Sequence, residues 1–278
     1  MTEGVLYYLL GTRHWNVAVT SLLSLREVYD GPVSVLLVDD LALEMFDRIK
    51  KDGRLDPIDG IDFRSKQQVY GRHTGYMNKP KIVFASPYDS TVYLDADTIV
   101  AKPIDSLFGK QYGGRPWLTM FAGWQTNGGR MKRRLLRWKE VMPDEVEYQT
   151  THPLPAINTG VVSFTKGERA ELFGADWMAT TESNPGFIAD EMAAQLLIRD
   201  HGVILVDDRW NCSPIYGKFK DDVVVWHLHG RKHLREVALP IWWPWYQRAV
   251  EMNLAGIAEW TPSGVDRLAR KLEEDKAE

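Results

Sequence analysis

Short apolar runs alternate with helical segments along the first hundred residues. Residues 5–10, 33–38 and 91–94 are apolar runs of strand length, each followed at once by a glycine or an aspartate. Residues 17–28 and 41–50 lie between them and carry apolar side chains at helical spacing. Strands that alternate with helices are joined by crossover connections, which favour parallel pairing. The pattern therefore predicts an α/β fold with a single, mostly parallel central sheet flanked by helices.

Similar signals continue through the rest of the chain, without an internal repeat or a low-complexity linker. We expect part of a short helix at 81–85, strands at 160–164, 203–206 and 223–228, a helix at 189–199 and a charged amphipathic helix at 265–276.

Composition narrows the classes of protein that this chain can be. Its 278 residues are 44% hydrophobic, so a large core can be buried. A net charge of −4 argues against a surface that binds nucleic acid throughout. Cys212 is the single cysteine, which excludes an internal disulfide and a cysteine-based zinc site and favours a reducing compartment.

Hydropathy argues against export and membrane insertion. No stretch reaches the ~20 apolar residues of a membrane span. The apolar run at 5–10 is shorter than the core of a secretory signal and follows Glu3 rather than basic residues. We therefore expect a soluble, cytoplasmic protein without a transmembrane segment.

Two carboxylates follow the apolar run at 91–94. Asp95 and Asp97 are separated by one residue and have no basic neighbour, a pattern that suits a hard cation such as Mg²⁺ or Mn²⁺. Such a cation can neutralise a departing diphosphate. Many Asp-x-Asp pairs are only turns or helix caps. A phosphatase that uses the first Asp as nucleophile fits less well, because Ile99 stands where it has Thr or Val.

The segments around this pair resemble, in order, the glycosyltransferases of family eight, which includes glycogenin and bacterial lipopolysaccharide galactosyltransferases. The likeness covers roughly residues 5–235. It is carried by Asn78-Lys79-Pro80, the stretches 87–100 and 103–108, Asn158-Thr159-Gly160-Val161-Val162, Asp190-Glu191, Arg209-Trp210-Asn211 and 226–232.

The resemblance implies an A-type nucleotide-diphospho-sugar transferase fold. Residues 1–235 would form the nucleotide-sugar transferase domain. Residues 236–278 would be a Trp-rich, helical C-terminal extension packed on the same domain.

The resemblance also implies a metal site and a donor site. Asp95, Asp97 and His227 would bind Mn²⁺ or Mg²⁺, with His229 as the rival of His227. Lys79 would contact the nucleotide-sugar. The other residues that the resemblance implies bind the donor are Gly11, Thr12, Arg13, Asp39, Ala96, Gly230 and Lys232.

One motif departs from the family pattern. Lys232 follows Gly230 by two positions, whereas the family has its lysine three positions after the glycine. Arg231 or His233 could take over the contact with the diphosphate.

Three residues are expected beside the donor sugar. The resemblance places Asn158 and Asp190 there, with Glu191 as the rival carboxylate. An amide and a carboxylate can hydrogen-bond sugar hydroxyls and position the anomeric carbon. Asp190 could instead be only a helix N-cap.

The resulting hypothesis is a metal-dependent glycosyltransferase that uses a nucleoside-diphosphate sugar, with a UDP-sugar favoured, and retains the anomeric configuration. An oxygen of the diphosphate would take the acceptor's proton; inversion would instead make Asp190 or Glu191 the candidate base. One alternative is a sugar nucleotidyltransferase, although residues 11–14 match its Gly-rich basic loop poorly. Another is a non-catalytic nucleotide- or carbohydrate-binding protein, which would not need a complete metal site.

The acceptor and the oligomeric state do not follow from the sequence. Glycan, lipid, protein and nucleic-acid acceptors all stay open. The basic segment 130–139 fits a helix with Met131, Leu135 and Trp138 inward; a solvated face is favoured there over a dock for an anionic acceptor. For the tryptophans of 242–245, core packing is favoured over stacking on acceptor sugars.

Overall fold

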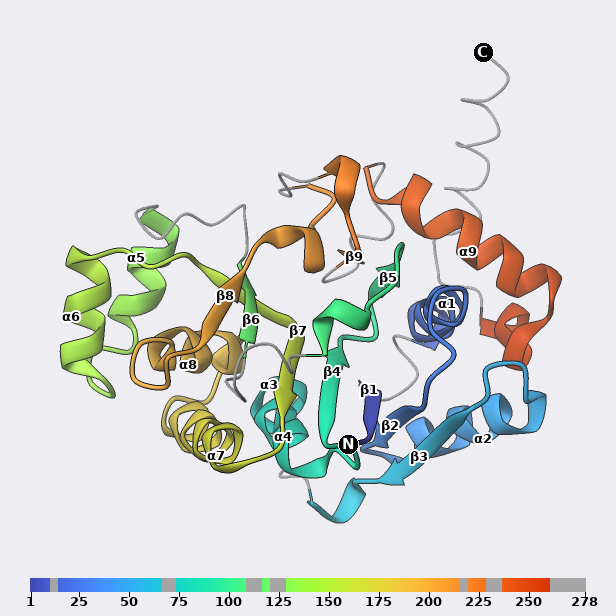
Figure 1. Ribbon diagram of the computed structural model, residues 1–278, viewed down its shortest axis with the longest axis horizontal. Coiled ribbons are helices and arrows are strands. Elements are labelled where there is room, and N and C mark those ends of the chain that lie inside the picture. Colours follow the sequence, from blue (N-terminus) through green and yellow to red (C-terminus); the bar gives the residue numbers. More distant parts are fainter. Residues whose placement is uncertain are drawn as a thin grey trace.

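The computed structural model describes residues 1–10, 15–66, 74–108, 117–120, 129–215, 220–228 and 237–260. Within these ranges seven strands form one sheet in the order β3-β2-β1-β4-β7-β6-β8 (Figure 1). They are β1 (Glu3–Leu9), β2 (Val33–Leu37), β3 (Ile58–Asp62), β4 (Ser90–Leu94), β6 (Trp117–Met120), β7 (Ile157–Thr165) and β8 (Ile204–Val206).

The sheet is mostly parallel, as predicted. β1 pairs in parallel with β2 and β4, β2 with β3, and β6 with β8. β7 runs antiparallel to both of its neighbours, β4 and β6. A further two-stranded antiparallel sheet joins β5 (Thr98–Val100) to β9 (Val225–His227) beyond the end of β4.

Helices cover both faces of the sheet (Figure 1). They are α1 (Trp15–Arg26), α2 (Asp40–Asp52), α3 (Thr74–Asn78), α4 (Ile82–Ala85), α5 (Gly129–Leu136), α6 (Pro143–Thr151), α7 (Glu168–Ser183), α8 (Ala189–Leu197) and α9 (Leu239–Glu251). The predicted helix at 265–276 lies outside the described residues.

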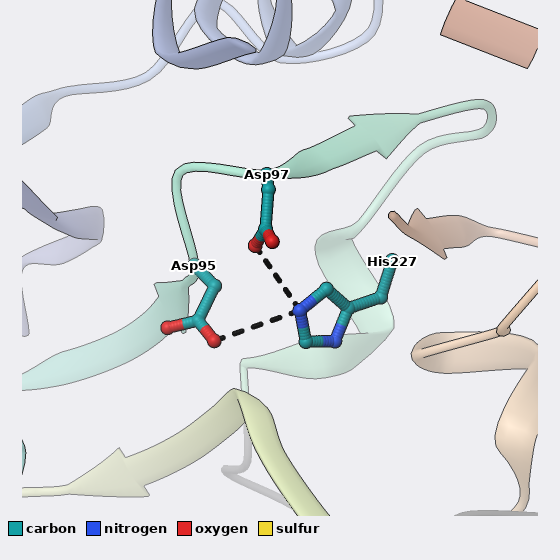
Figure 2. A group of neighbouring side chains, drawn as sticks. All are labelled: Asp95, Asp97 and His227. Carbon is teal, nitrogen blue, oxygen red and sulfur yellow. Dashed lines mark hydrogen bonds and ion pairs between the residues drawn. The ribbon is translucent and has the colours of Figure 1, made fainter. Parts of the chain in front are cut away.

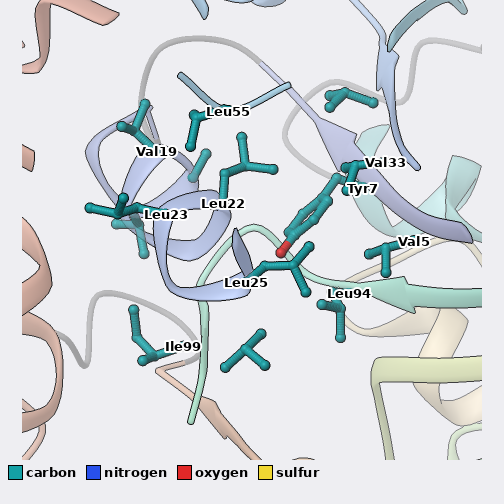
Figure 3. Packing of buried hydrophobic residues seen from close by; sticks show 14 of the residues in the cluster. Val5, Tyr7, Val19, Leu22, Leu23, Leu25, Val33, Leu55, Leu94 and Ile99 are labelled. Carbon is teal, nitrogen blue, oxygen red and sulfur yellow. The ribbon is translucent and has the colours of Figure 1, made fainter. Parts of the chain in front are cut away.

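The core has two parts, one on each face of the sheet. Because successive side chains of a strand point to opposite faces, Val5, Tyr7 and Leu9 join the cluster that contains α1, α2 and α9. Leu6 and Tyr8 join the cluster on the opposite face, with α4 to α8. Figure 3 shows the first cluster, in which leucines of α1 pack on side chains of β1, β2 and β4. A strand buried on both faces must be apolar throughout. This explains why the apolar runs at 5–10 and 33–38 predicted strands β1 and β2.

Strands β3, β5 and β6 were not predicted. β3 lies at the sheet edge, and its residues after Ile58 are largely exposed and include Asp59 and Gly60, so it lacks an apolar run. The basic segment does begin as a helix, α5, and Met131, Leu135 and Trp138 are buried as expected.

The C-terminal helix α9 packs on α1 and shares its core. Trp242 is fully buried, its indole N–H donates to Thr20 Oγ1 at 3.0 Å, and its ring stacks on Tyr246. Core packing is thus confirmed for Trp242, whereas Trp243 and Trp245 are half-buried. The division of the chain at residue 235 stays a prediction. None of the helices in the described ranges has the length and apolar character needed to cross a membrane.

Trp242→Ala should lower the free energy of unfolding by about 3–5 kcal/mol, because it empties a buried indole site and removes the hydrogen bond that Thr20 Oγ1 accepts. Trp245→Ala, at a half-buried position of the same helix, should cost about 1 kcal/mol. Urea unfolding of the two variants measures the difference. Equal losses would show that α9 is not integrated into the core.

Candidate active site

Asp95, Asp97 and His227 come together at one end of the parallel strands. Asp95 follows β4 directly, Asp97 precedes β5, and His227 ends β9 (Figure 2). The β5–β9 pairing sets Thr98 opposite His227, and the backbone N–H of Leu228 donates to Asp97 O at 2.8 Å. Backbone pairing therefore joins two ligand-type residues that are 130 positions apart in the chain.

The three side chains converge on one point. His227 Nε2 lies 3.1 Å from Asp97 Oδ1 and 3.6 Å from Asp95 Oδ2. One ligand atom from each residue lies within 4.8 Å of the others. Neighbouring ligands of an octahedral ion such as Mg²⁺ lie about 3 Å apart. The group of two carboxylates and one imidazole could therefore hold a divalent metal ion.

The imidazole fits closely against β7. A Cβ atom added at Gly160 would lie 2.2 Å from His227 Cε1 and 2.4 Å from Nδ1. Only glycine leaves room for the ring there, so the Asn158-Thr159-Gly160 motif shapes the site as well as lining it. The carbonyl oxygen of Gly160 also accepts a hydrogen bond from the backbone N–H of Asp95 at 2.8 Å.

Lys79 is a buried cation beside the same cluster. Its Nζ lies 2.8 Å from Asp95 Oδ1 and 3.5 Å from Asp190 Oδ2. Burial lowers the pKa of the ammonium, but Asp95 and Asp190 outweigh burial and the pKa of Lys79 is raised. Lys79 is therefore charged at neutral pH. On the other side of Asp95, the hydroxyl of Tyr93 donates to Oδ1 at 2.5 Å.

Asp190 lies deep in the site with one oxygen unsatisfied. Asp190 belongs to the first turn of α8, and only 2% of the residue is exposed. Its Oδ2 accepts from Thr159 Oγ1 at 2.8 Å, whereas Oδ1 is buried without a hydrogen-bond partner. Burial raises the pKa of Asp190, with Lys79 opposing the rise. Ile188, not Asp190, occupies the N-cap position of α8, so the capping interpretation of Asp190 is wrong.

Asn158 and Glu191 form a connected pair next to Asp190. Asn158 Nδ2 donates to Glu191 Oε2 at 2.8 Å, and Arg134 Nη1 lies 2.9 Å from Glu191 Oε1. Burial raises the pKa of Glu191, and Arg134 opposes that rise. Both carboxylate oxygens of Glu191 are thus engaged within the protein.

Comparison with known proteins identifies the architecture. No protein-family model matches the chain, and no curated protein matches it in sequence. Among solved structures, the glycosyltransferase GlyE of Streptococcus pneumoniae aligns with a TM-score of 0.62 and 15% identity, over 93% of this chain and 64% of that one. Mouse xyloside xylosyltransferase 1 gives 0.57 and 13%, over 83% and 98% of the two chains. The galactosyltransferase LgtC, solved with donor and acceptor sugar analogues, gives 0.55 and 14%, over 91% and 95%.

The chain has the A-type glycosyltransferase fold. It spans slightly less than two thirds of the GlyE structure but nearly the whole of the other two. At these identities the likeness establishes the fold and not the reaction.

The A-type fold brings together most of the predicted site residues that the structure describes. Asp95, Asp97, His227, Lys79, Asn158, Asp190 and Glu191 form one connected cluster, and Ala96 lies in the turn between the two aspartates. Asp39 lies two residues after β2 and caps α2, where its Oδ1 accepts a hydrogen bond from the backbone N–H of Ala42 at 2.7 Å. Its contact with a nucleoside stays a prediction. The remaining predicted residues and their rivals lie outside the described part of the chain: Gly11, Thr12, Arg13, His229, Gly230, Arg231, Lys232 and His233.

Three residues of the cluster were not predicted as site residues. Tyr93 and Thr159 bond to Asp95 and Asp190. Asn211 bonds to His227 Nδ1 at 2.8 Å. All three lie in segments that carry the family resemblance, Tyr93 in the stretch 87–100, Thr159 in Asn158-Thr159-Gly160-Val161-Val162 and Asn211 in Arg209-Trp210-Asn211, but none of those motifs indicated their individual contacts.

Mn²⁺ should stabilise the folded protein through the three converging side chains. A ligand at 100 times its Kd adds about 2.7 kcal/mol to the free energy of unfolding. Asp97→Asn should abolish the increase in melting temperature that Mn²⁺ produces. Asp176→Asn is the matched control, because Asp176 pairs with His201 at 2.9 Å on the surface outside the site. A wild-type protein that responds to neither Mn²⁺ nor Mg²⁺ would contradict the metal assignment.

The Asp190→Asn variant should become more stable relative to the wild type, in free energy of unfolding, as the pH rises. The unfolded carboxyl titrates at a pKa of about 4, and the folded one at a raised pKa. Between the two values the folded state holds the extra proton, so the wild type loses stability with rising pH, whereas the amide does not titrate. Urea unfolding in EDTA at pH 4 and pH 7 measures the trend, and an opposite slope would contradict the burial argument.

Proposed function

We propose that the protein is a metal-dependent glycosyltransferase related to family eight, which transfers a sugar from a nucleoside-diphosphate sugar and retains the anomeric configuration. A UDP-sugar is the favoured donor. The observation that carries the proposal is the convergence of Asp95, Asp97 and His227 within 4.8 Å, at a strand end of a fold shared with glycosyltransferases. A nucleotide-binding protein without catalysis would not require this third, distant ligand.

The residues of the site divide the work of the proposed reaction. A divalent ion held by Asp95, Asp97 and His227 would supply positive charge for the departing diphosphate. Lys79 keeps the Asp95 carboxylate oriented through its 2.8 Å contact and adds a permanent charge nearby. Asp190, with its free buried oxygen, supports a hydrogen bond to a hydroxyl of the donor sugar. The acceptor's proton would pass to a diphosphate oxygen, so no protein base is needed.

Exposed cations on and after α5 are a possible docking surface for the acceptor. Lys132, Arg137 and Lys139 are exposed on and after α5, whereas the neighbouring Arg134 is engaged by Glu191. An anionic acceptor could dock on these cations. For these exposed cations a solvated face stays the favoured interpretation. The cation of this segment that contacts the site is Arg134, and it is paired with Glu191. A cytoplasmic location also stays a proposal, based on the composition of the chain.

Release of nucleoside diphosphate from UDP-, GDP-, ADP- and dTDP-sugars, with Mn²⁺, Mg²⁺ or EDTA, tests the proposed reaction. We expect metal-dependent release from one donor, lowered at least about 100-fold in the Asp95→Ala/Asp97→Ala variant and unchanged in Asp176→Asn. Appearance of pyrophosphate from a nucleoside triphosphate and a sugar phosphate would identify a nucleotidyltransferase instead. Metal-dependent binding of a donor without release, even with a panel of acceptors, would favour a binding protein.

A further inference from the structure

We propose that Asn211 is a positioning residue for the metal site, and that it is held in place by a chain of hydrogen bonds that ends at Arg134 on α5. The inference rests on the proposed metal site. Asn211 would not contact the ion or the substrate. It would fix the orientation and the proton of the ligand His227.

The contact between Asn211 and His227 sets which ring nitrogen faces the carboxylates. His227 Nδ1 lies 2.8 Å from Asn211 Oδ1, and Nε2 faces Asp95 and Asp97. An amide oxygen can only accept, so the imidazole N–H is on Nδ1. With a cation between the two carboxylates, the lone pair of Nε2 would face that cation; without one, the 3.1 Å contact with Asp97 Oδ1 requires a proton on Nε2. Neutral imidazole in this tautomer is the form that binds a metal through Nε2.

The orientation of the Asn211 amide is fixed at its other end. Asn211 Nδ2 lies 3.0 Å from Asn158 Oδ1 and 3.3 Å from Asn158 O. The amide therefore donates toward Asn158 and accepts from His227. Backbone bonds hold the segment as well, because the N–H of Cys212 donates to Val225 O and the N–H of His227 donates to Cys212 O. Asn211 is 1% exposed and has little freedom to turn.

The chain continues in the same direction and ends on a charge. Asn158 Nδ2 donates to Glu191 Oε2 at 2.8 Å, and Arg134 lies 2.9 Å from the other oxygen of Glu191. Each donor, from His227 through Asn211 and Asn158, thus points toward the Glu191 carboxylate. Hydrogen bonds aligned in this way polarise one another. The effect on the imidazole resembles that of a carboxylate bonded to it directly, an arrangement that makes histidine a better metal ligand.

The dissociation constant of Mn²⁺, measured from the electron paramagnetic resonance signal of the free ion, tests the inference without any substrate. Asn211→Leu keeps the branching of the side chain but removes its hydrogen bonds to His227 and Asn158, and it should weaken Mn²⁺ binding 10- to 100-fold. Asn211→Asp keeps an acceptor for Nδ1 and should bind Mn²⁺ at least tenfold more tightly than Asn211→Leu. Arg134→Met, at the far end of the chain, should weaken binding a few-fold. Asp176→Asn should bind as the wild type does.

The outcomes separate this inference from the proposed function. Wild-type protein that binds no Mn²⁺ would overturn the metal site itself. Wild type and Asn211→Leu binding Mn²⁺ equally would overturn only the role of Asn211. If Asn211→Leu does not fold, the comparison passes to Arg134→Met, whose altered residue lies far from the imidazole. Unchanged Mn²⁺ affinity in that variant would overturn the chain.

Discussion

A concentration of negative charge on buried and partly buried side chains is the constraint on which the rest of the site depends. Asp95, Asp97 and Asp190 surround a single ammonium group, that of Lys79, with contacts of 2.8 and 3.5 Å to two of them. Burying like charges is costly unless other charges compensate for them. Among the described residues, these three carboxylates in their ionised forms exceed the Lys79 ammonium by two negative charges, which one divalent cation would neutralise. Burial raises the pKa of Asp190, and the nearby Asp95 carboxylate adds to the rise while Lys79 opposes it.

The fold meets this constraint by joining strand ends that are distant in sequence. The parallel strands β1, β2 and β4 direct their carboxyl ends to one edge of the sheet, where ligands bind in open α/β sheets. The antiparallel β5–β9 pair then carries His227 back to the turn that follows β4. Gly160, on β7, leaves the space that the imidazole ring fills. The site therefore depends on pairing between strands from both halves of the chain.

The sequence was most informative where one local cause determined the structure. Strands buried on both faces had to be apolar, and the motifs of the active site could be recognised by their order. Strand β3 was missed because an edge strand with Asp59 and Gly60 has no such pattern. The reversed direction of β7 depends on its neighbours and not on its own residues. The contacts of Lys79 with Asp190, and of Asn211 with His227, arise only when four separate segments meet.

Two adjacent carboxylates at the start of α8 illustrate why position along a chain does not determine a role. Successive helical residues project about 100° apart, so Asp190 faces Lys79 whereas Glu191 faces Arg134. Glu191 has both oxygens engaged, by Arg134 and by Asn158, and its part is to anchor the network behind His227. Asp190 keeps one buried oxygen unpartnered, at a cost in stability that a bound hydroxyl would remove. Of the two candidates, Asp190 is therefore the carboxylate that, under the proposed function, would hydrogen-bond a hydroxyl of the donor sugar.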